Sequence, residues 1–391
     1  MAEPTLKRSR STAEFLKKYF LAGQKTTDEC SVTDIDSSPL DKFVARHRKV
    51  IGLLLPFLFV QIIYWLLVNE YGFYRLFASR YEMALVMMFG AAVGGATAEG
   101  GGAIAFPVLT LAFHVPATTA RDFAVMIQTV AAASVQLMGI MTEKHTLIFA
   151  SLGGCFGTII SLEILDDVIS PDYKKMGFVS VFFSFAIALY LLNKEKKRQT
   201  FDVIQHFDLK KAALLIVVGF MGGLFSGIAG SGLDVFSFSI ITLLFRINEK
   251  VATPTTVSLA GINSAIAFFW RHHKQHAIEP LAWEYFAVCV PVVSLFGPLG
   301  SLIASHFHRL TLAVFIYILE TIALVSAFLI IQPDLLLVAI SASIIIICTF
   351  LYIALAKLGE RFAARHKIAP TDFEGNPPST VCERIEGSER H

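Results

Sequence analysis

Apolar runs of about 20 residues recur along most of this chain, and they limit its fold more than any other feature. A run of this length is what an α-helix needs to cross the hydrocarbon core of a bilayer. Of the 391 residues, 55% are hydrophobic and 16% are charged, whereas a soluble domain is roughly 45–50% apolar and 25% charged. The sequence therefore predicts an all-α polytopic membrane protein, an integral multi-pass protein that has the lipid bilayer as a partner.

Two basic segments indicate which parts of the chain face the cytoplasm. Ten Lys and Arg residues lie between Lys7 and Lys49, ahead of the first apolar run, and six lie within residues 193–211. Basic loops stay on the cytoplasmic side of a membrane. We therefore expect the N-terminus and the 193–211 segment to be cytoplasmic, and the C-terminus, which is also basic after its last apolar run, to lie on the same side.

A glycine-rich stretch interrupts one of the apolar segments. Gly94 to Pro107 reads GGATAEGGGAIAFP and lies inside the apolar segment Met83–Val115. The two halves of that segment, about 15 and 13 residues, are each short for a full crossing. Glycine frees the backbone to leave helical geometry, so this stretch predicts a broken or re-entrant helix.

A second copy of the stretch occurs much later. Gly222 to Ser237 reads GGLFSGIAGSGLDVFS, and its core Gly230-Ser231-Gly232 corresponds to Gly100-Gly101-Gly102. Each copy carries one carboxylate, which is Glu99 in the first and Asp234 in the second. The chain therefore contains an internal repeat centred on two breaks.

Further matches between the halves follow in the same order. They are Ala120 with Ala252, Gly154 with Gly297, and Gly157 with Gly300. Glycines at this spacing bring membrane helices close together, and we interpret the last two pairs as packing positions.

The number of crossings predicts that the two repeats have opposite orientations. One span after a cytoplasmic N-terminus puts the region before Met83 outside, while residues 193–211 are inside, so the first repeat crosses an odd number of times. The inference of an odd number of crossings fails only if each broken segment is a single kinked span. The basic loop Arg271–His276 is an exception, because this topology puts it outside. Inverted-topology repeats with discontinuous helices at the midplane are typical of secondary carriers.

The expected organisation has seven parts. They are a cytoplasmic, basic and disordered tail at 1–48, a first span and outer loop at 49–82, transport repeat 1 at 83–192, a cytoplasmic linker at 193–211, transport repeat 2 at 212–331, a last span at 332–357, and a second cytoplasmic tail at 358–391.

The breaks are suited to bind an anion. A helix that begins after a break points its positive dipole end and its free N–H groups into the gap, and two facing gaps make a compact anion site. Tight packing or a simple kink is the alternative explanation. The candidate substrate-binding residues are Gly100, Gly101, Gly102, Arg121, Gln128, Gly230, Ser231, Gly232, Thr253, Thr255 and Asn263.

Each charged or polar candidate also has a structural interpretation. Glu99 and Asp234 could carry a coupling proton, because burial and a nearby anion both favour the protonated form, or they could cap the loose backbone. Arg121 could bind an oxyanion or pair with the adjacent Asp122. The polar residues Gln128, Thr253, Thr255 and Asn263 could line a cavity or form interhelical hydrogen bonds.

Signatures of enzymes and of metal or nucleotide binding are not found. The chain has no P-loop, no HExxH and no nucleophile elbow, and Gly100–Gly102 does not continue into GKS or GKT. The histidines His272, His273 and His276 have no acidic partners at metal-ligand spacing. We therefore expect no catalytic residues, no metal, no cofactor and no nucleic-acid partner.

The repeated motifs resemble those of the sulfite exporter TauE/SafE family, also called the 4-toluene sulfonate uptake permeases. In the first copy Gly100-Gly101-Gly102 is followed by AIAF and Pro107, and in the second Gly230-Ser231-Gly232 is followed by LDVF and Ser237. Ser231 replaces a glycine and Ser237 replaces the proline of the family pattern. The resemblance covers residues 83–331 and implies transport of small sulfur-containing anions, such as sulfite, sulfonates or sulfoacetate, coupled to protons.

These observations together predict a secondary carrier in the plasma membrane that moves a small anionic substrate by alternating access. Two alternatives are a cation-coupled carrier of another small anion, in which the carboxylates bind the ion, and a membrane receptor or scaffold that transports nothing. The sequence does not indicate an oligomeric state.

Overall fold

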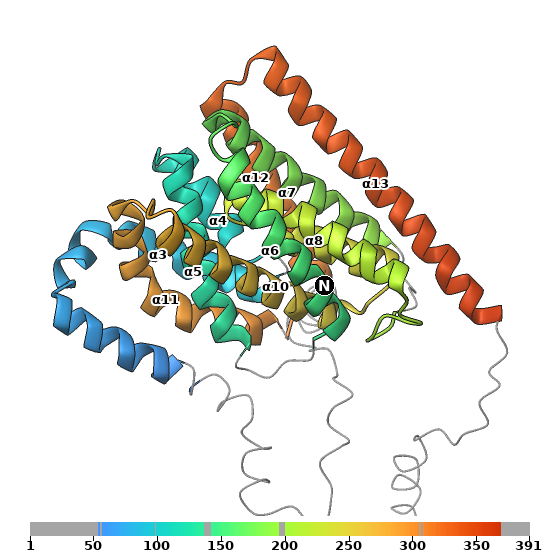
Figure 1. Cartoon of the computed structure of the whole chain (residues 1–391), viewed down its shortest axis with the longest axis horizontal. Coiled ribbons are helices and arrows are strands. Elements are labelled where there is room, and N and C mark those ends of the chain that lie inside the picture. Colours follow the sequence, from blue (N-terminus) through green and yellow to red (C-terminus); the bar gives the residue numbers. More distant parts are fainter. Residues whose placement is uncertain are drawn as a thin grey trace, which may run out of the picture.

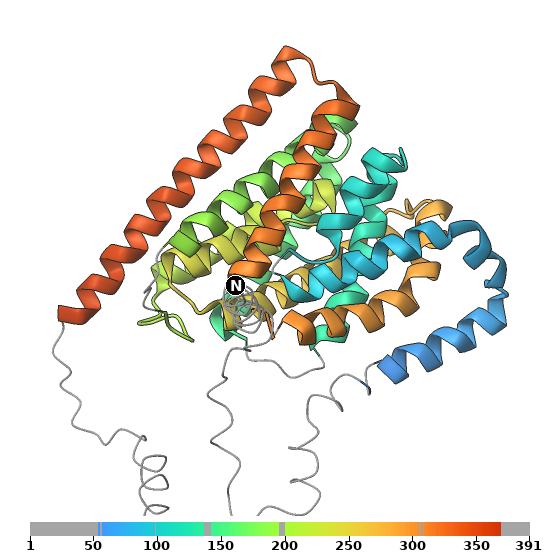
Figure 2. The same ribbon diagram turned by 180° about the vertical axis from the view of Figure 1, so that it is seen from behind.

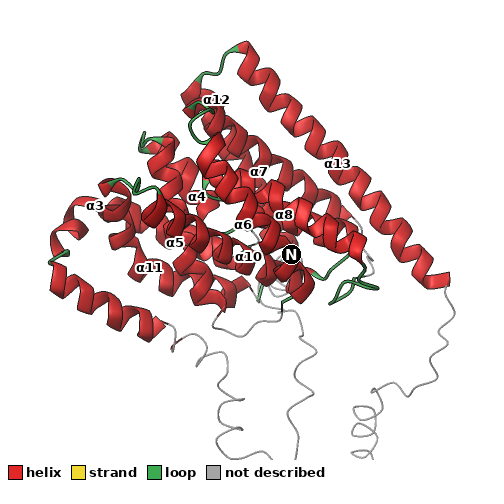
Figure 3. Cartoon of the chain, in the orientation of Figure 1, coloured by secondary structure: helices red, strands yellow, loops and turns green. Residues whose placement is uncertain are grey.

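The computed structural model describes residues 54, 57–97, 99–136, 142–194, 200–304, 306–307 and 309–368. Within these residues every element is a helix (Figure 3), which confirms the all-α prediction. The expected disordered tails at 1–48 and beyond Ile368 lie outside the described residues. The labelled helices are α3 (Tyr74–Ala96), α4 (Gly102–Pro107), η3 (Val108–Ala112), α5 (Ala117–Gln136), α6 (Lys144–Ile160), η4 (Ser161–Leu165), α7 (Pro171–Lys194), α8 (Leu209–Ala229), α9 (Leu233–Ser239), η5 (Ile240–Leu244), α10 (Glu249–Phe269), η6 (Trp270–Lys274), α11 (Pro280–Ala304), α12 (Arg309–Ile331) and α13 (Leu335–Ile368), where η marks a π-helical turn.

The described part of the chain has 8 helices that are long and apolar enough to cross a membrane, so the polytopic prediction is also confirmed. One boundary differs from the sequence prediction. Helix α3 begins at Tyr74, ahead of the expected start at Met83, but its backbone leaves helical geometry at Arg80 (φ −130, ψ 17). The helical stretch that leads into the break therefore starts after this kink.

Both breaks reverse the direction of the chain. A Cβ built on Gly94 in α3 would overlap the backbone nitrogen of Gly101, and one on Gly90 would lie 3.4 Å from the side chain of Ile104 in α4. In the second copy a Cβ on Gly222 would lie 2.8 Å from Cα of Leu233 and 3.4 Å from Cβ of Phe236. The short helices α4 and α9 therefore fold back along α3 and α8, and each break forms a hairpin.

The same order of elements occurs twice. The first copy runs through α3, α4, η3, α5, α6, η4 and α7, and the second through α8, α9, η5, α10, η6, α11 and α12. They differ only in the place of the second π-helical turn, which follows α6 in the first copy and α10 in the second. The first helix of each copy packs against a helix of the other copy: α8 packs against α6, and α3 packs against α11. In Figures 1 and 2 these helices form a single bundle.

Glycines lie at both of these contacts between the copies. A Cβ on Gly95 of α3 would overlap the carbonyl oxygen of Gly297 in α11, and a Cβ on Gly223 of α8 would overlap that of Gly154 in α6. Gly154 and Gly297 are a matching pair of the internal repeat, so the same contact is built in both halves. The interpretation of these glycines as packing positions is thereby confirmed.

The equivalent helices α5 and α10 run in opposite directions. Asp122 near the start of α5 binds Arg271 just beyond the end of α10, and Gln128 in the middle of α5 binds Ser264. Beyond the other end of α5, the Glu143 amide donates to Thr255, near the start of α10. This arrangement agrees with an inverted repeat, which stays a prediction for the protein as a whole.

The last two helices lie at the edge of the bundle. In the most apolar windows of α12 and α13 only 17% of residues are buried, and α13 lies along one side in both views (Figures 1 and 2). Ser341 of α13 makes a hydrogen bond to Ser180 of α7 at 2.6 Å. Their exposed apolar side chains fit helices that face lipid.

The close glycine contacts make a prediction about stability. We expect Gly95→Ala and Gly223→Ala each to destabilise the protein by about 1–3 kcal/mol, because the added methyl forces tightly packed backbones apart. Thermal unfolding in detergent measures this. Gly177→Ala in α7, where a Cβ meets nothing within 4 Å, is the control, and melting temperatures equal to that of this control would contradict the proposed packing.

Candidate functional site

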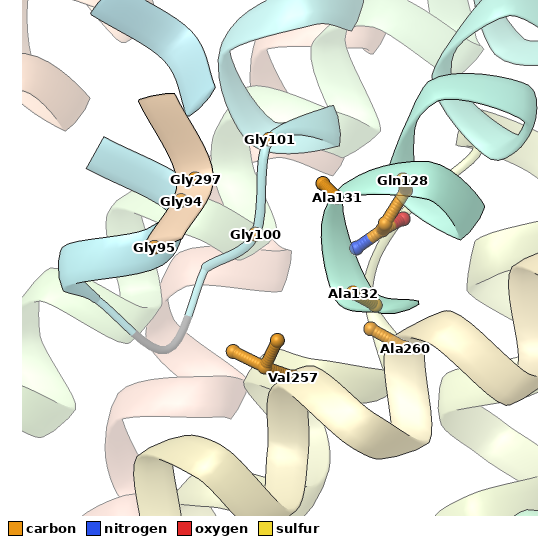
Figure 4. A pocket seen from close by; sticks show the side chains of 10 residues that line it. All are labelled: Gly94, Gly95, Gly100, Gly101, Gln128, Ala131, Ala132, Val257, Ala260 and Gly297. Atoms are coloured by element: carbon orange, nitrogen blue, oxygen red, sulfur yellow. The ribbon is translucent and has the colours of Figure 1, made fainter. Parts of the chain in front are cut away.

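A pocket lies against the first break, between the two halves (Figure 4). Its walls are formed by α3, the first break, α5, α10 and α11. The lining residues are Gly94, Gly95, Gly100, Gly101, Gln128, Ala131, Ala132, Val257, Ala260 and Gly297. The pocket is narrow and has room for roughly one water molecule. The walls must therefore move before a larger solute can fit.

The two breaks meet at Gln128 of α5. Gly100 has φ +71, and a Cβ there would lie 2.5 Å from Nε2 of Gln128 and 3.1 Å from a carboxylate oxygen of Asp234. A Cβ on Gly102 would lie 3.1 Å from Cβ of Ser231 in the second break. Figure 4 shows the Gln128 side chain directed towards the Gly100 segment. The structure thus brings together five predicted site residues: Gly100, Gly102, Gln128, Ser231 and Asp234.

Asp234 holds the second break in shape. One of its oxygens accepts hydrogen bonds from the amides of Gly232 and Val235, both at 3.0 Å, and Ser231 and Gln128 donate to the other at 3.1 and 3.4 Å. A carboxylate in this position caps the start of α9 and complements its dipole. The second break is therefore already filled by a carboxyl group of the protein itself.

The first break has no such cap. The amides of Gly100 and Gly101 donate no hydrogen bond to another described residue, and they border the pocket. Glu99 is fully buried, and no backbone amide of the described residues donates to its carboxyl group. The two carboxylates, which have similar positions in the sequence, therefore have different surroundings.

A second buried carboxyl group lies next to Glu99 and comes from a distant helix. It belongs to Glu320 of α12. Sequence reasoning left Glu320 unassigned. A carboxylate within an apolar span was the signal that could have identified it, but its partner was not readable.

Arg121 is buried in an ion-pair network instead of facing the pocket. Its guanidinium contacts Asp122 at 2.8 Å and Asp166 at 2.5 Å. Asp122 also binds Arg271 at 2.7 Å, and Asp166 binds Lys174 at 2.5 Å. Of the two interpretations of Arg121, the structure therefore supports pairing with Asp122, and it adds three members that the sequence did not reveal.

Three other candidates make contacts between or within helices. Thr255 donates to the Val251 carbonyl and accepts from the Glu143 amide, while Asn263 accepts from Thr158 at 2.9 Å. Thr253 lies near the start of α10 and is partly buried. None of these three lines the pocket. Gly230, with φ +84, packs against the backbone of Arg121.

Metal ligands are not assembled anywhere in the described ranges, where no group of three or more His, Cys, Asp or Glu side chains could hold an ion. The loop histidines His272 and His273 lie next to aromatic rings, His272 beside Phe268 and Trp283 and His273 beside Phe269.

The ion-pair network predicts a pH dependence of stability. Burial by itself raises the pKa of Asp166, but Arg121 and Lys174 outweigh it, so this pKa lies below the ordinary value of 3.8. A lowered pKa stabilises the fold above pH 3.8, and this contribution is lost as the pH falls through the pKa of the folded state.

We therefore expect Asp166→Asn to lower the stability at pH 7 by about 3–5 kcal/mol, because it leaves buried cations unpaired. Thermal unfolding in detergent from pH 7 to pH 3 should show the difference from the native protein shrinking below about pH 4. The control is Asp172→Asn at an exposed ion pair, where we expect less than about 1 kcal/mol. A difference that is constant with pH would contradict the ion pairing of Asp166.

Comparison with known proteins supports the resemblance seen in the motifs. The family model described as "Sulfite exporter TauE/SafE" matches residues 83–326, which is more than half of the chain and includes both breaks. The comparisons with curated proteins and with solved structures gave no match. The chain thus belongs to the sulfite exporter TauE/SafE family and is an integral membrane transporter rather than an enzyme.

Proposed function

We propose that the protein is a secondary carrier of small sulfur-containing anions, of the sulfite, sulfonate or sulfoacetate class, and that it is coupled to protons. One observation carries the proposal: a pocket lies at the first break, bordered by Gly100 and Gly101, and the buried carboxyl group of Glu99 adjoins these two residues. We further propose that it acts in the plasma membrane with both termini cytoplasmic, as the basic segments indicate.

The first break is the part of the site best suited to the anion. The amides of Gly100 and Gly101, which bond to no other described residue, can donate to an oxyanion, as exposed backbone N–H groups do in other anion sites. Gln128 borders the same pocket with a side-chain amide. The second break contributes indirectly, because Asp234 and Ser231 hold Gln128 and the return helix α9 in position.

Glu99 is the better candidate for coupling. Two carboxyl groups in a site closed to water do not both carry charge, because like charges are poorly screened there. Glu99 has the carboxyl group of Glu320 beside it, and no backbone amide of the described residues donates to it. Asp234, in contrast, accepts hydrogen bonds from two backbone amides, so we assign it the role of a cap.

Alternating access is supported by two features of the bundle. The hairpins occur once in each half, and the equivalent helices α5 and α10 run antiparallel across the pocket. The narrow pocket between them fits a conformation in which the site is nearly closed. A carrier of this kind exposes one central site to each side in turn.

Transport itself is tested in proteoliposomes. Uptake of labelled sulfite, sulfonates and sulfoacetate is measured with and without a pH gradient, against vesicles that contain no protein. We expect at least one of these anions to enter, and the gradient to increase its accumulation. The absence of flux for all of them would contradict the proposal.

Variants of the two carboxylates separate their roles. We expect Glu99→Gln to abolish the effect of the pH gradient while anion exchange across the membrane continues, because glutamine keeps the shape but carries no proton. Asp234→Asn should remain dependent on the gradient and unfold at a lower temperature. Asp172→Asn, an exposed carboxylate, is the control for both. Full gradient dependence in Glu99→Gln would exclude Glu99 from coupling.

A further inference from the structure

The ion-pair network around Arg121 connects the two halves of the transporter at one end of the bundle. Asp122 at the start of α5 belongs to the first half, and Arg271 at the end of α10 belongs to the second. Their side chains form a two-pronged contact, with Nε of Arg271 at 2.9 Å from one carboxylate oxygen and its terminal nitrogen at 2.7 Å from the other. This geometry is the strongest that Arg and a carboxylate make.

The rest of the network extends this link into the first half. Arg121 binds both Asp122 and Asp166, and Lys174 of α7 binds Asp166. These are three cations and two carboxylates, and all five side chains are at most 9% exposed. Pairs this well buried stay together because separating them leaves charges without water.

The anion pocket lies on the far side of the middle of the bundle from this network. Along α5 the network is at Asp122, Gln128 is six residues further, and the pocket continues to Ala132, so the pocket begins about 9 Å and ends about 15 Å along the helix. On the antiparallel α10, the pocket residues Val257 and Ala260 likewise lie far from Arg271. The network thus lies at one end of the bundle, and the pocket lies further towards the other end.

The opposite end of the bundle is the one near the 193–211 linker. His145 at the start of α6 stacks on Phe207 of the linker at 4.2 Å, whereas Asp166, just beyond the end of the same helix, belongs to the network. The counterparts of Arg121 and Asp122 in the second repeat are Thr253 and Pro254, which carry no charge. The two ends are therefore chemically different although the helices repeat.

We infer that the Asp122–Arg271 ion pair is the gate on the face opposite the linker, and that the structure is a conformation in which this gate is shut. The inference rests on the proposed carrier function. Opening requires the two halves to separate at this pair, and water that enters then hydrates the charges that the closed state had paired. Of the remaining members only Arg121 contacts Asp122, while Asp166 binds both Arg121 and Lys174 within the first half.

Access of a thiol reagent to the pocket tests this gate without requiring transport. Ala131→Cys, on the pocket wall, is introduced into the full chain after its own cysteines are replaced, and a membrane-impermeant reagent is applied to either face of oriented vesicles. Val203→Cys in the linker and Asp172→Cys at the start of α7 mark the two faces. We expect Ala131→Cys to react from the linker face and to be protected from the other face.

The gate variant is Arg271→Gln in this background. We expect it to raise the rate of reaction from the face opposite the linker by about tenfold or more, because one partner of a buried pair is lost. If Arg271→Gln does not fold, Arg271→Lys, which keeps the charge, replaces it as the test variant. It should show a smaller increase in the labelling rate from the face opposite the linker.

Two controls remove other ion pairs near the same face. Glu284→Gln breaks the half-exposed pair with Arg80, and Lys174→Gln removes a buried member of the network but keeps the link between the halves. Both should leave Ala131→Cys protected. Equal rates in Arg271→Gln, Glu284→Gln and Lys174→Gln would overturn the gate. Because labelling is independent of flux, a failure of sulfite uptake would contradict the carrier function and leave this result standing.

Discussion

The hydrocarbon core of a membrane offers no water to satisfy a broken helix, so irregular backbone is tolerated only where it is buried in protein or lines a cavity. This constraint explains the arrangement of the bundle. The two glycine breaks lie against each other at Gln128, and around them the helix pairs α3 with α11 and α6 with α8 pack at glycine contacts. The repeat lets each half cover the break of the other.

The two breaks satisfy the same constraint in different ways. The second is filled by the carboxylate of Asp234, which accepts the amides at the start of α9. The first contains the amides of Gly100 and Gly101, which bond to no other described residue, a narrow pocket, and the buried carboxyl group of Glu99 beside that of Glu320. A transport site needs such unsatisfied groups for its ligand, so we place the substrate and the coupling proton at the first break and give the second a supporting role.

Much of this arrangement could be predicted from the sequence, because its signals are local. Glycine runs inside apolar segments predicted the breaks, and the repeat predicted that Gly154 and Gly297 would have equivalent packing. The partner of a charged residue was not predictable in this way. Arg121 binds Asp166 and Asp122 binds Arg271 because distant helices meet, and Glu320 approaches Glu99 from α12 for the same reason. The kink of α3 at Arg80 was not predictable, because no glycine or proline lies at that position.

The central claim is that the anion binds between the Gly100–Gly101 backbone and Gln128. The most direct test is a crystal structure with a small brominated sulfonate, in which the anomalous signal of bromine marks the ligand. We predict a signal in the pocket beside Gln128, with the sulfonate oxygens within hydrogen-bond distance of the Gly100 and Gly101 amides. A ligand bound at Arg121 with the Asp122 and Asp166 pairs broken, and none at the first break, would contradict the account.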